Sequence, residues 1–195
     1  MKGKKYVSMQ IDILNKMKNM AIINLFTLSH LRPDKSVIYF NIKPSDVFSM
    51  ASCLYFMLLD SNEIIGFSRL DIKRSIHAWI EEDIIYNNGN YALSGDEYYG
   101  LLPTDIIDCC HKKYSTPDMC RIINKKIIGL KIIKLHEESV RKYPNERGLL
   151  FQLEYDLELC MSAELSYAGV SSMVLHNKVE IKEELLDKIE YITVF

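Results

Sequence analysis

The stretch between Phe67 and Leu102 constrains the fold of this chain more than any other. Its first half places apolar residues at three- and four-residue steps, which predict an amphipathic helix that ends at about Asp83. Two short apolar runs follow, and Asn87-Asn-Gly-Asn90 between them favours the positive φ angles of a hairpin turn. Ser94-Gly-Asp-Glu97 has the spacing of a capping box, which starts a helix. The sequence therefore predicts helix, hairpin and helix in direct succession.

The first of these helices has a cationic face. An apolar stripe that includes Ile76 and Trp79 would anchor the helix in the domain. Four cationic side chains share the opposite face because they fall at four-residue spacing or beside it: Arg69, Lys73, Arg74 and His77. Such a face could supply donors to phosphates and base edges in a major groove, or it could be an ordinary solvated surface.

Over about residues 45–102, the order of these elements resembles the winged helix-turn-helix superfamily of DNA-binding proteins. The resemblance is one of topology, and it implies that the cationic helix reads DNA while the hairpin serves as the wing. Two features depart from the superfamily: the turn before the cationic helix is short, and the wing tip carries asparagines where many wings carry arginine or lysine. The DNA-contacting residues that the resemblance implies are Arg69, Lys73, Arg74, His77, Asn88 and Asn90.

Helical patterns dominate the rest of the chain. Residues 46–59 are apolar on almost every side, which predicts a central helix that is covered all round. Further amphipathic helices are expected over residues 7–31, from the start signal at Ser115-Thr-Pro-Asp118 to about residue 143, and over residues 179–189. Residues 37–42 are rich in β-branched and aromatic side chains, which favours a short strand.

Residues 149–160 are ambiguous. Phe151, Leu153 and Tyr155 alternate with polar residues, as in a strand with one buried face. Apolar residues in the same segment also fall on a helical stripe, and leucine, glutamate and glutamine prefer helices. We favour the helix, because the pattern continues with small residues after residue 161.

These patterns predict a mainly α protein with a small β-hairpin, an α+β fold in which a winged helix-turn-helix precedes a C-terminal helical region. Residues 1–44 would form an N-terminal helix and a short strand packed on the core. Residues 45–114 would form the winged-helix-like domain. Residues 115–195 would form the helical C-terminal region, which is expected to mediate dimerisation or partner binding.

The charge is distributed unevenly along the chain. The net charge of −2 divides into +5 for residues 1–80, −1 for residues 81–145 and −6 for residues 146–195. A basic front and an acidic back suit a protein that contacts a polyanion with one end and a protein with the other. Chance unevenness explains the counts equally well.

Cysteine usage and the N-terminal pattern predict a cytoplasmic protein with reduced thiols. The five cysteines are odd in number and irregularly spaced, and the first twelve residues do not have the pattern of a signal peptide. The longest apolar run, Val47–Leu59, is too short to cross a bilayer, so no membrane contact is expected. Cys109, Cys110 and Cys120 lack the paired spacing of a zinc site, so we expect free thiols and no metal.

The sequence contains no pattern that indicates catalysis. It has no nucleophile elbow and no phosphate-binding glycine loop, so we expect neither an enzyme nor a cofactor. The function predicted first is sequence-specific DNA binding by a regulator of transcription, or by a replication or partition factor, acting as a homodimer through its C-terminal helices. The alternative is a protein–protein adaptor or inhibitor that does not bind DNA, which the pI of about 6.2 also fits.

Overall fold

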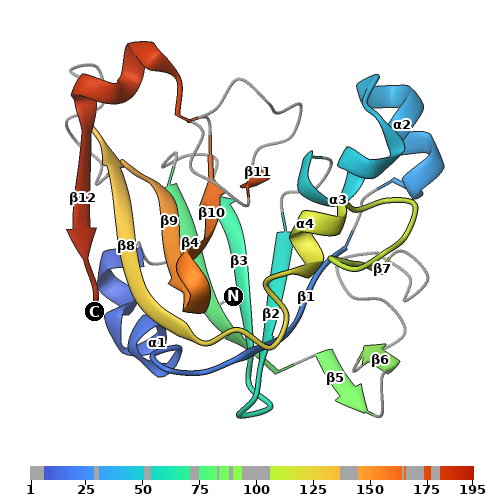
Figure 1. Ribbon diagram of the computed structural model, residues 1–195, viewed down its shortest axis with the longest axis horizontal. Helices are drawn as coiled ribbons and strands as arrows, with labels where there is room; N and C mark the ends of the chain where they lie inside the picture. The colour runs from blue at the N-terminus through green and yellow to red at the C-terminus, as the bar shows by residue number, and fades with distance from the viewer. Residues whose placement is uncertain are drawn as a thin grey trace.

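Two antiparallel sheets, each of five strands, pack face to face and form the body of the protein (Figure 1). The computed structural model describes residues 7–28, 31–50, 54–70, 75–82, 84–87, 90–93, 106–136, 145–163, 165, 174–176 and 181–195. The predicted mainly α fold is wrong, because the α-helices among these residues are only four to eight residues long. The fold is mainly β.

The two sheets share one topology. In each sheet four strands follow one another as a meander, and a fifth strand returns to pair beside the first. The first sheet has the order β4-β3-β2-β1-β7 and contains β1 (Ile22–Leu28), β2 (Leu54–Leu59), β3 (Ile64–Leu70), β4 (Ser75–Glu81) and β7 (Ile106–Asp108). The second has the order β11-β10-β9-β8-β12 and contains β8 (Ile127–Leu135), β9 (Glu146–Leu153), β10 (Leu157–Ser162), β11 (Val174–His176) and β12 (Ile189–Thr193).

The two halves are joined where β1 and β8 begin. Ala21 and Lys126 form an antiparallel bridge, and the backbone N–H of Ile22 donates to the carbonyl of Lys125 at 3.0 Å. The N–H of Asn124 donates back to the carbonyl of Ile22 at 2.7 Å. We call residues 19–22 and 124–127 the crossing. It ties the first strand of one sheet to the first strand of the other.

The main core lies between the sheets. The rings of Phe67 on β3 and Phe151 on β9 meet edge to face across it, with centroids 6.0 Å apart. Each sheet also buries part of its outer face. Phe26 and Phe56 pack there with Ile84 in the first sheet, and Ile133 and Leu150 pack with Cys160 in the second. The central strands are therefore covered on both sides.

Short helices and one hairpin complete the described chain. The helices are η1 (Val7–Gln10), α1 (Ile11–Lys16), α2 (Pro33–Phe40), η2 (Pro44–Asp46), α3 (Val47–Met50), α4 (Pro117–Cys120), η6 (Glu154–Asp156) and η7 (Glu183–Lys188). The predicted hairpin is confirmed: β5 (Ile84–Asn87) pairs with β6 (Asn90–Leu93). Its capped helix from Ser94 lies outside the described residues. No helix in the described part of the chain is long and apolar enough to cross a membrane.

A side chain from η1 forms hydrogen bonds with backbone groups of the edge strand β4. The amide nitrogen of Gln10 donates to the carbonyl of Ala78, and its amide oxygen accepts from the N–H of Ala78 at 3.2 Å. The buried Gln10 side chain thus imitates one residue of a neighbouring strand.

The predicted cationic helix is replaced by strands β3 and β4. Along β4, Ile76 and Ala78 face the main core while Trp79 packs on the outer face. This alternation has the period of two that a strand requires, and it overrides the weaker three- and four-residue pattern. Gly66 lies opposite Trp79, and a Cβ added at Gly66 would lie 2.3 Å from the indole ring. The glycine therefore allows the indole to lie across β3.

The other helix predictions fail for related reasons. The apolar run over 46–59 divides into α3 and the fully buried β2, because a uniformly apolar segment has no period that distinguishes helix from strand. Residues 149–160 form β9 and β10, so the strand alternative was the right one. In the described parts of the helices predicted over 7–31, 118–143 and 179–189, the helical residues are those of η1 with α1, of α4 and of η7, and each is followed by a strand. Residues 37–40, predicted as strand, belong to α2.

Replacing Gly66 with alanine is expected to destabilise the protein by about 1–3 kcal/mol, because the new methyl group must displace the indole of Trp79. Chemical denaturation followed by Trp79 fluorescence measures the effect. In a Trp79→Leu background, followed by circular dichroism, the same replacement should cost clearly less. An equal cost in both backgrounds would contradict the proposed clash.

Candidate protein-binding site

The β9–β10 turn holds an aromatic residue in an unfavourable backbone conformation. Tyr155 has φ 65° and ψ 35°, and Asp156 follows with φ 56°. Glycine and asparagine adopt this left-handed region readily, whereas a bulky side chain there costs about 1 kcal/mol. The Tyr155 side chain is nevertheless 79% exposed, so burial in the core does not offset the cost. Exposed aromatics at strained positions are typical of binding sites.

A groove of about 410 Å³ adjoins this turn. Six residues line it: Cys120, Arg121, Ile123, Lys125, Tyr155 and Leu157. We call it the Tyr155 groove. Its lining combines apolar side chains with two cations, and none of its described residues is a carboxylate.

The Tyr155 groove is held in shape by contacts between the turn and the crossing. The N–H of Glu154 donates to the carbonyl of Lys126 at 3.1 Å, and a carboxylate oxygen of Glu154 accepts from the N–H of Lys126 at 3.2 Å. The ammonium of Lys125 lies over the ring of Tyr155, 4.7 Å from its centroid. The turn that supplies Tyr155 is therefore fixed to the crossing.

A disulfide supports the opposite wall. Cys110 and Cys120 are bonded, with Cα atoms 4.7 Å apart, and Cys120 lines the groove. The prediction of free thiols is wrong for this pair, because the nine intervening residues fold back through α4 and bring the two cysteines together. The predicted helix start is confirmed, with Thr116 at the N-cap and Pro117 in the first turn, although α4 ends at Cys120.

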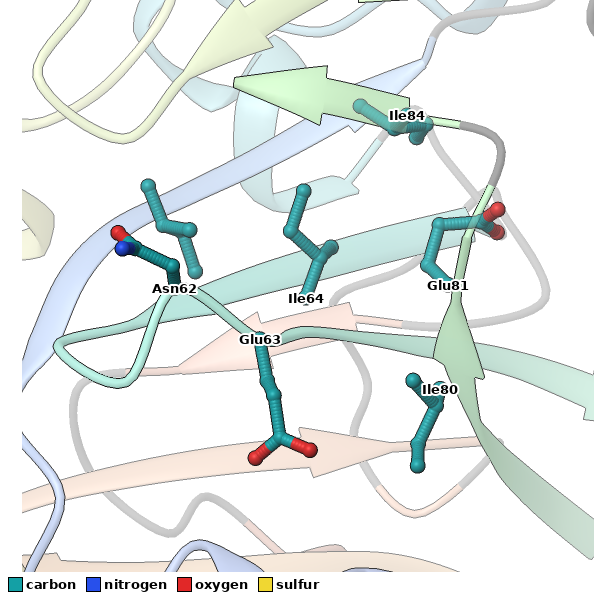
Figure 2. A pocket seen from close by; sticks show the side chains of 7 residues that line it. Asn62, Glu63, Ile64, Ile80, Glu81 and Ile84 are labelled. Carbon is teal, nitrogen blue, oxygen red and sulfur yellow. The ribbon is translucent and has the colours of Figure 1, made fainter. Parts of the chain in front are cut away.

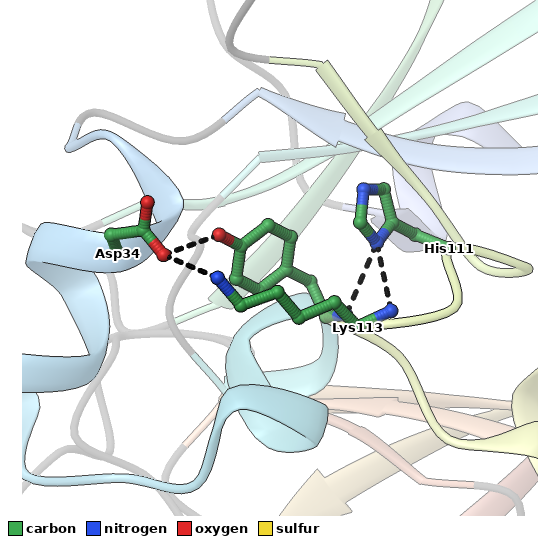
Figure 3. A network of polar contacts seen from close by, with 4 residues as sticks. Asp34, His111 and Lys113 are labelled. Atoms are coloured by element: carbon green, nitrogen blue, oxygen red, sulfur yellow. Dashed lines mark hydrogen bonds and ion pairs between the residues drawn. The ribbon is translucent and has the colours of Figure 1, made fainter.

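The loop closed by this disulfide is clamped to α2. Asp34 on α2 accepts hydrogen bonds from the ammonium of Lys113 at 2.8 Å and from the hydroxyl of Tyr114 at 2.5 Å (Figure 3). Both hydrogen bonds lower the pKa of Asp34, and the one from Lys113 has the larger effect. The same bond to Asp34 raises the pKa of Lys113. The Nδ1 atom of His111 accepts from the backbone N–H groups of both Lys113 and Tyr114, as an N-cap side chain does.

A second hollow, of about 310 Å³, lies where the β2–β3 turn meets the end of β4. Glu63 and Glu81 belong to its lining, but Figure 2 shows them pointing to opposite sides of the strand pair. Each is already engaged: Glu63 pairs with Lys16 at 2.6 Å, and Glu81 accepts from the indole N–H of Trp79 at 2.8 Å. The two carboxylates therefore do not form an acid–base pair.

Three of the six residues predicted to contact DNA belong to the described chain, and each lies on a different strand. His77, on β4, stacks on Trp79 with ring centroids 5.3 Å apart, and its Nδ1 lies 3.1 Å from the amide oxygen of Gln10. Arg69 lies on β3 and Asn90 begins β6. Lys73, Arg74 and Asn88 lie outside the described residues.

The residues of the Tyr155 groove were missed because their sequence signal is weak. Glu154-Tyr-Asp156 lacks the glycine or asparagine that marks a tight turn, and the alternation on either side of it was read as helix. Lys125 was predicted to lie on the outside of a long helix, and Arg121 was not identified as a candidate. Apolar and polar residues alternate without a break from Phe151 to Leu159, so the alternation does not locate the turn.

Cys109 and Cys160 are free cysteines with buried side chains. Burial raises the pKa of both the Cys109 and the Cys160 thiols to about 12. Among the described residues no three histidine, cysteine or acidic side chains are placed to hold a metal ion.

Alkylation should distinguish the cysteines. With a pKa of about 12, only about one thiol in ten thousand is ionised at pH 8, so Cys109 and Cys160 should resist iodoacetamide in the folded protein and react after denaturation. Cys110 and Cys120 should react only after reduction. Peptide mass spectrometry measures all four sites, and rapid labelling of native Cys109 would contradict its burial.

Comparisons with known proteins supply no relative. No family model, no curated protein and no solved structure matches this chain.

Proposed function

We propose that this chain is a protein-binding module, an adaptor or inhibitor, that engages its partner through Tyr155 and the Tyr155 groove. The observation that carries the proposal is the strained and 79% exposed tyrosine beside a groove whose walls are fixed. Tyrosine and arginine are the residues most enriched at the energetic centres of protein interfaces, and both are present here.

Tyr155 differs from the other exposed aromatic residues of the described chain. Tyr39 is 75% exposed, but it lies in α2, where a tyrosine has an ordinary backbone conformation. Tyr191 is 46% exposed and lies on β12, where aromatic residues are common. Of these three tyrosines, only Tyr155 has a backbone conformation that is unfavourable for its residue type. This favours a role for Tyr155 outside folding.

DNA binding is not the function we propose. It was predicted from a recognition helix over residues 69–77, and the corresponding described residues belong to strands β3 and β4. The net charge of −2 and the pI of about 6.2 also fit a protein partner better than a polyanion.

A cytoplasmic location and a homodimer stay part of the proposal, each with a structural consequence. Cytoplasmic thiol systems reduce exposed disulfides, and Cys110 is exposed, so the Cys110–Cys120 bond would there form only under oxidation. A dimer contact in the last fifteen residues would fall on η7 and β12, and not on α-helices.

Affinity capture tests the proposed function. Wild-type protein, Tyr155→Asn and Tyr39→Asn are each immobilised and exposed to lysate of the cells that make the chain, and bound proteins are quantified by mass spectrometry. We expect a partner that wild type and Tyr39→Asn retain and that Tyr155→Asn loses by about tenfold or more, because Tyr155 is the anchor. The Tyr39 variant removes an equally exposed tyrosine, so it controls for nonspecific contact.

Two results would contradict this proposal. One is an identical set of bound proteins on all three columns. The other is retention on a double-stranded DNA column at physiological ionic strength that Tyr155→Asn leaves unchanged, which would favour the DNA-binding alternative.

Stability measurements test whether Tyr155 is kept for a reason other than folding. Tyr155→Asn should raise the free energy of unfolding by about 0.5–1 kcal/mol, because asparagine tolerates the left-handed conformation. The loss of the Lys125 contact reduces this gain. Tyr155→Phe, which keeps ring and strain, should leave stability unchanged. Urea denaturation measures both, and a destabilised Tyr155→Asn protein would show that the ring serves the fold.

A further inference from the structure

The chemistry of the Tyr155 groove indicates which kind of partner it takes. We infer that the groove binds an acidic, apolar segment of a protein, in which a carboxylate side chain stands beside an aliphatic or aromatic one. This inference rests on the proposed function and adds the class of ligand to it.

The carboxylate preference follows from the two cations of the lining. The Arg121 side chain is 65% exposed, and its pairing with Asp118 is long, at 3.6 Å, and open to water. Such exposed pairs contribute little, so the guanidinium can exchange Asp118 for a better-placed carboxylate at small cost. Lys125 directs its ammonium onto the face of Tyr155, where it keeps hydrogen-bond donors for a ligand.

The apolar preference follows from the rest of the lining. Ile123 and Leu157 are half-buried, so their exposed parts would be covered by a ligand side chain that replaces water. The ring of Tyr155 adds a third apolar surface. A ligand that offers only charge would leave these apolar surfaces exposed to water. A segment with both a carboxylate and an apolar side chain would contact the cations and the apolar surfaces together.

The surrounding charge favours an acidic protein segment over a nucleic acid. Residues 106–136, which supply most of the lining, contain seven lysines and arginines and two aspartates. The turn that supplies the rest adds the three carboxylates of Glu154, Asp156 and Glu158, so the two segments together keep a net charge of +2, although the whole chain has a net charge of −2. This local excess attracts acidic ligands. A nucleic acid requires a longer row of cations along its phosphates, whereas the groove itself offers two.

Peptide display tests the inference. Random dodecapeptides on phage are selected on wild-type protein and on the Arg121→Glu/Lys125→Glu variant, and individual clones are then measured by fluorescence anisotropy. Clones selected on wild type should be enriched in aspartate or glutamate beside apolar residues, and should bind the charge-reversed variant about tenfold or more weakly. Lys35→Glu/Lys112→Glu reverses the same number of charges at exposed lysines outside the groove and should bind as wild type does.

The outcomes separate the inference from the proposed function. Clones that require Tyr155 but bind both charge variants equally would overturn the carboxylate preference and leave the binding function standing. Displacement of the peptides by single-stranded oligo(dT) as readily as by free acidic peptide would overturn the protein ligand in favour of phosphate recognition. Clones that bind independently of Tyr155 would overturn the inference and the proposed function together. Circular dichroism of each variant confirms that lost binding is not lost folding.

Discussion

The hydrogen-bonded crossing of residues 19–22 with residues 124–127 is the constraint on which the two sheets depend. It fixes where β1 and β8 begin, and each of these strands then pairs on both edges, with the second and the fifth strand of its own sheet. Because the backbone of residues 124–126 is held on one side by Ile22, its other side can serve as a rigid support. The β9–β10 turn rests on that support through Glu154 and Lys126. The contacts that join the sheets therefore also position the turn that lines the Tyr155 groove.

The repeated topology explains why the chain buries apolar residues on both faces of its central strands. In each half the chain leaves the meander after the fourth strand. Apolar residues between the fourth and fifth strands pack on the outer face, with Ile84 in one sheet and Leu185 in the other. Strands covered on both faces read as unbroken apolar runs, as Leu54–Leu59 does. The clearest difference between the halves is the insertion of α2 and α3 between β1 and β2, and Asp34 anchors that insertion to the disulfide loop.

The sequence predicted local features of this fold better than its class. The asparagine-rich turn of β5 and β6 and the start of α4 at Pro117 were predictable because turn and cap chemistry acts within a few residues. The strands were not, because β2 has no period and the alternation of β4 competes with an overlapping helical spacing. The site was harder still. Cys110 meets Cys120 because the loop between them folds back, which their irregular spacing does not indicate. Lys125 meets Tyr155 only through the pairing of distant segments, which no local pattern encodes.

Tyr155 illustrates how a residue that disagrees with its own backbone can indicate function. Elsewhere in the described chain the left-handed positions are filled by asparagines, at residues 19, 41, 62, 124 and 145, which adopt the conformation at low cost. Only the turn of Tyr155 and Asp156 departs from that rule. Its neighbours cannot account for the departure through packing, since the ring is largely exposed and its one described partner is the ammonium of Lys125. The contact with Lys125 stabilises the turn by about 0.5–1 kcal/mol, which is no more than the backbone cost of tyrosine in this conformation. Tyrosine therefore has no net advantage over asparagine in the folded protein alone. A ligand that covers the ring would give tyrosine a stabilising contact that asparagine could not make. The turn and the groove are therefore best understood as one binding surface.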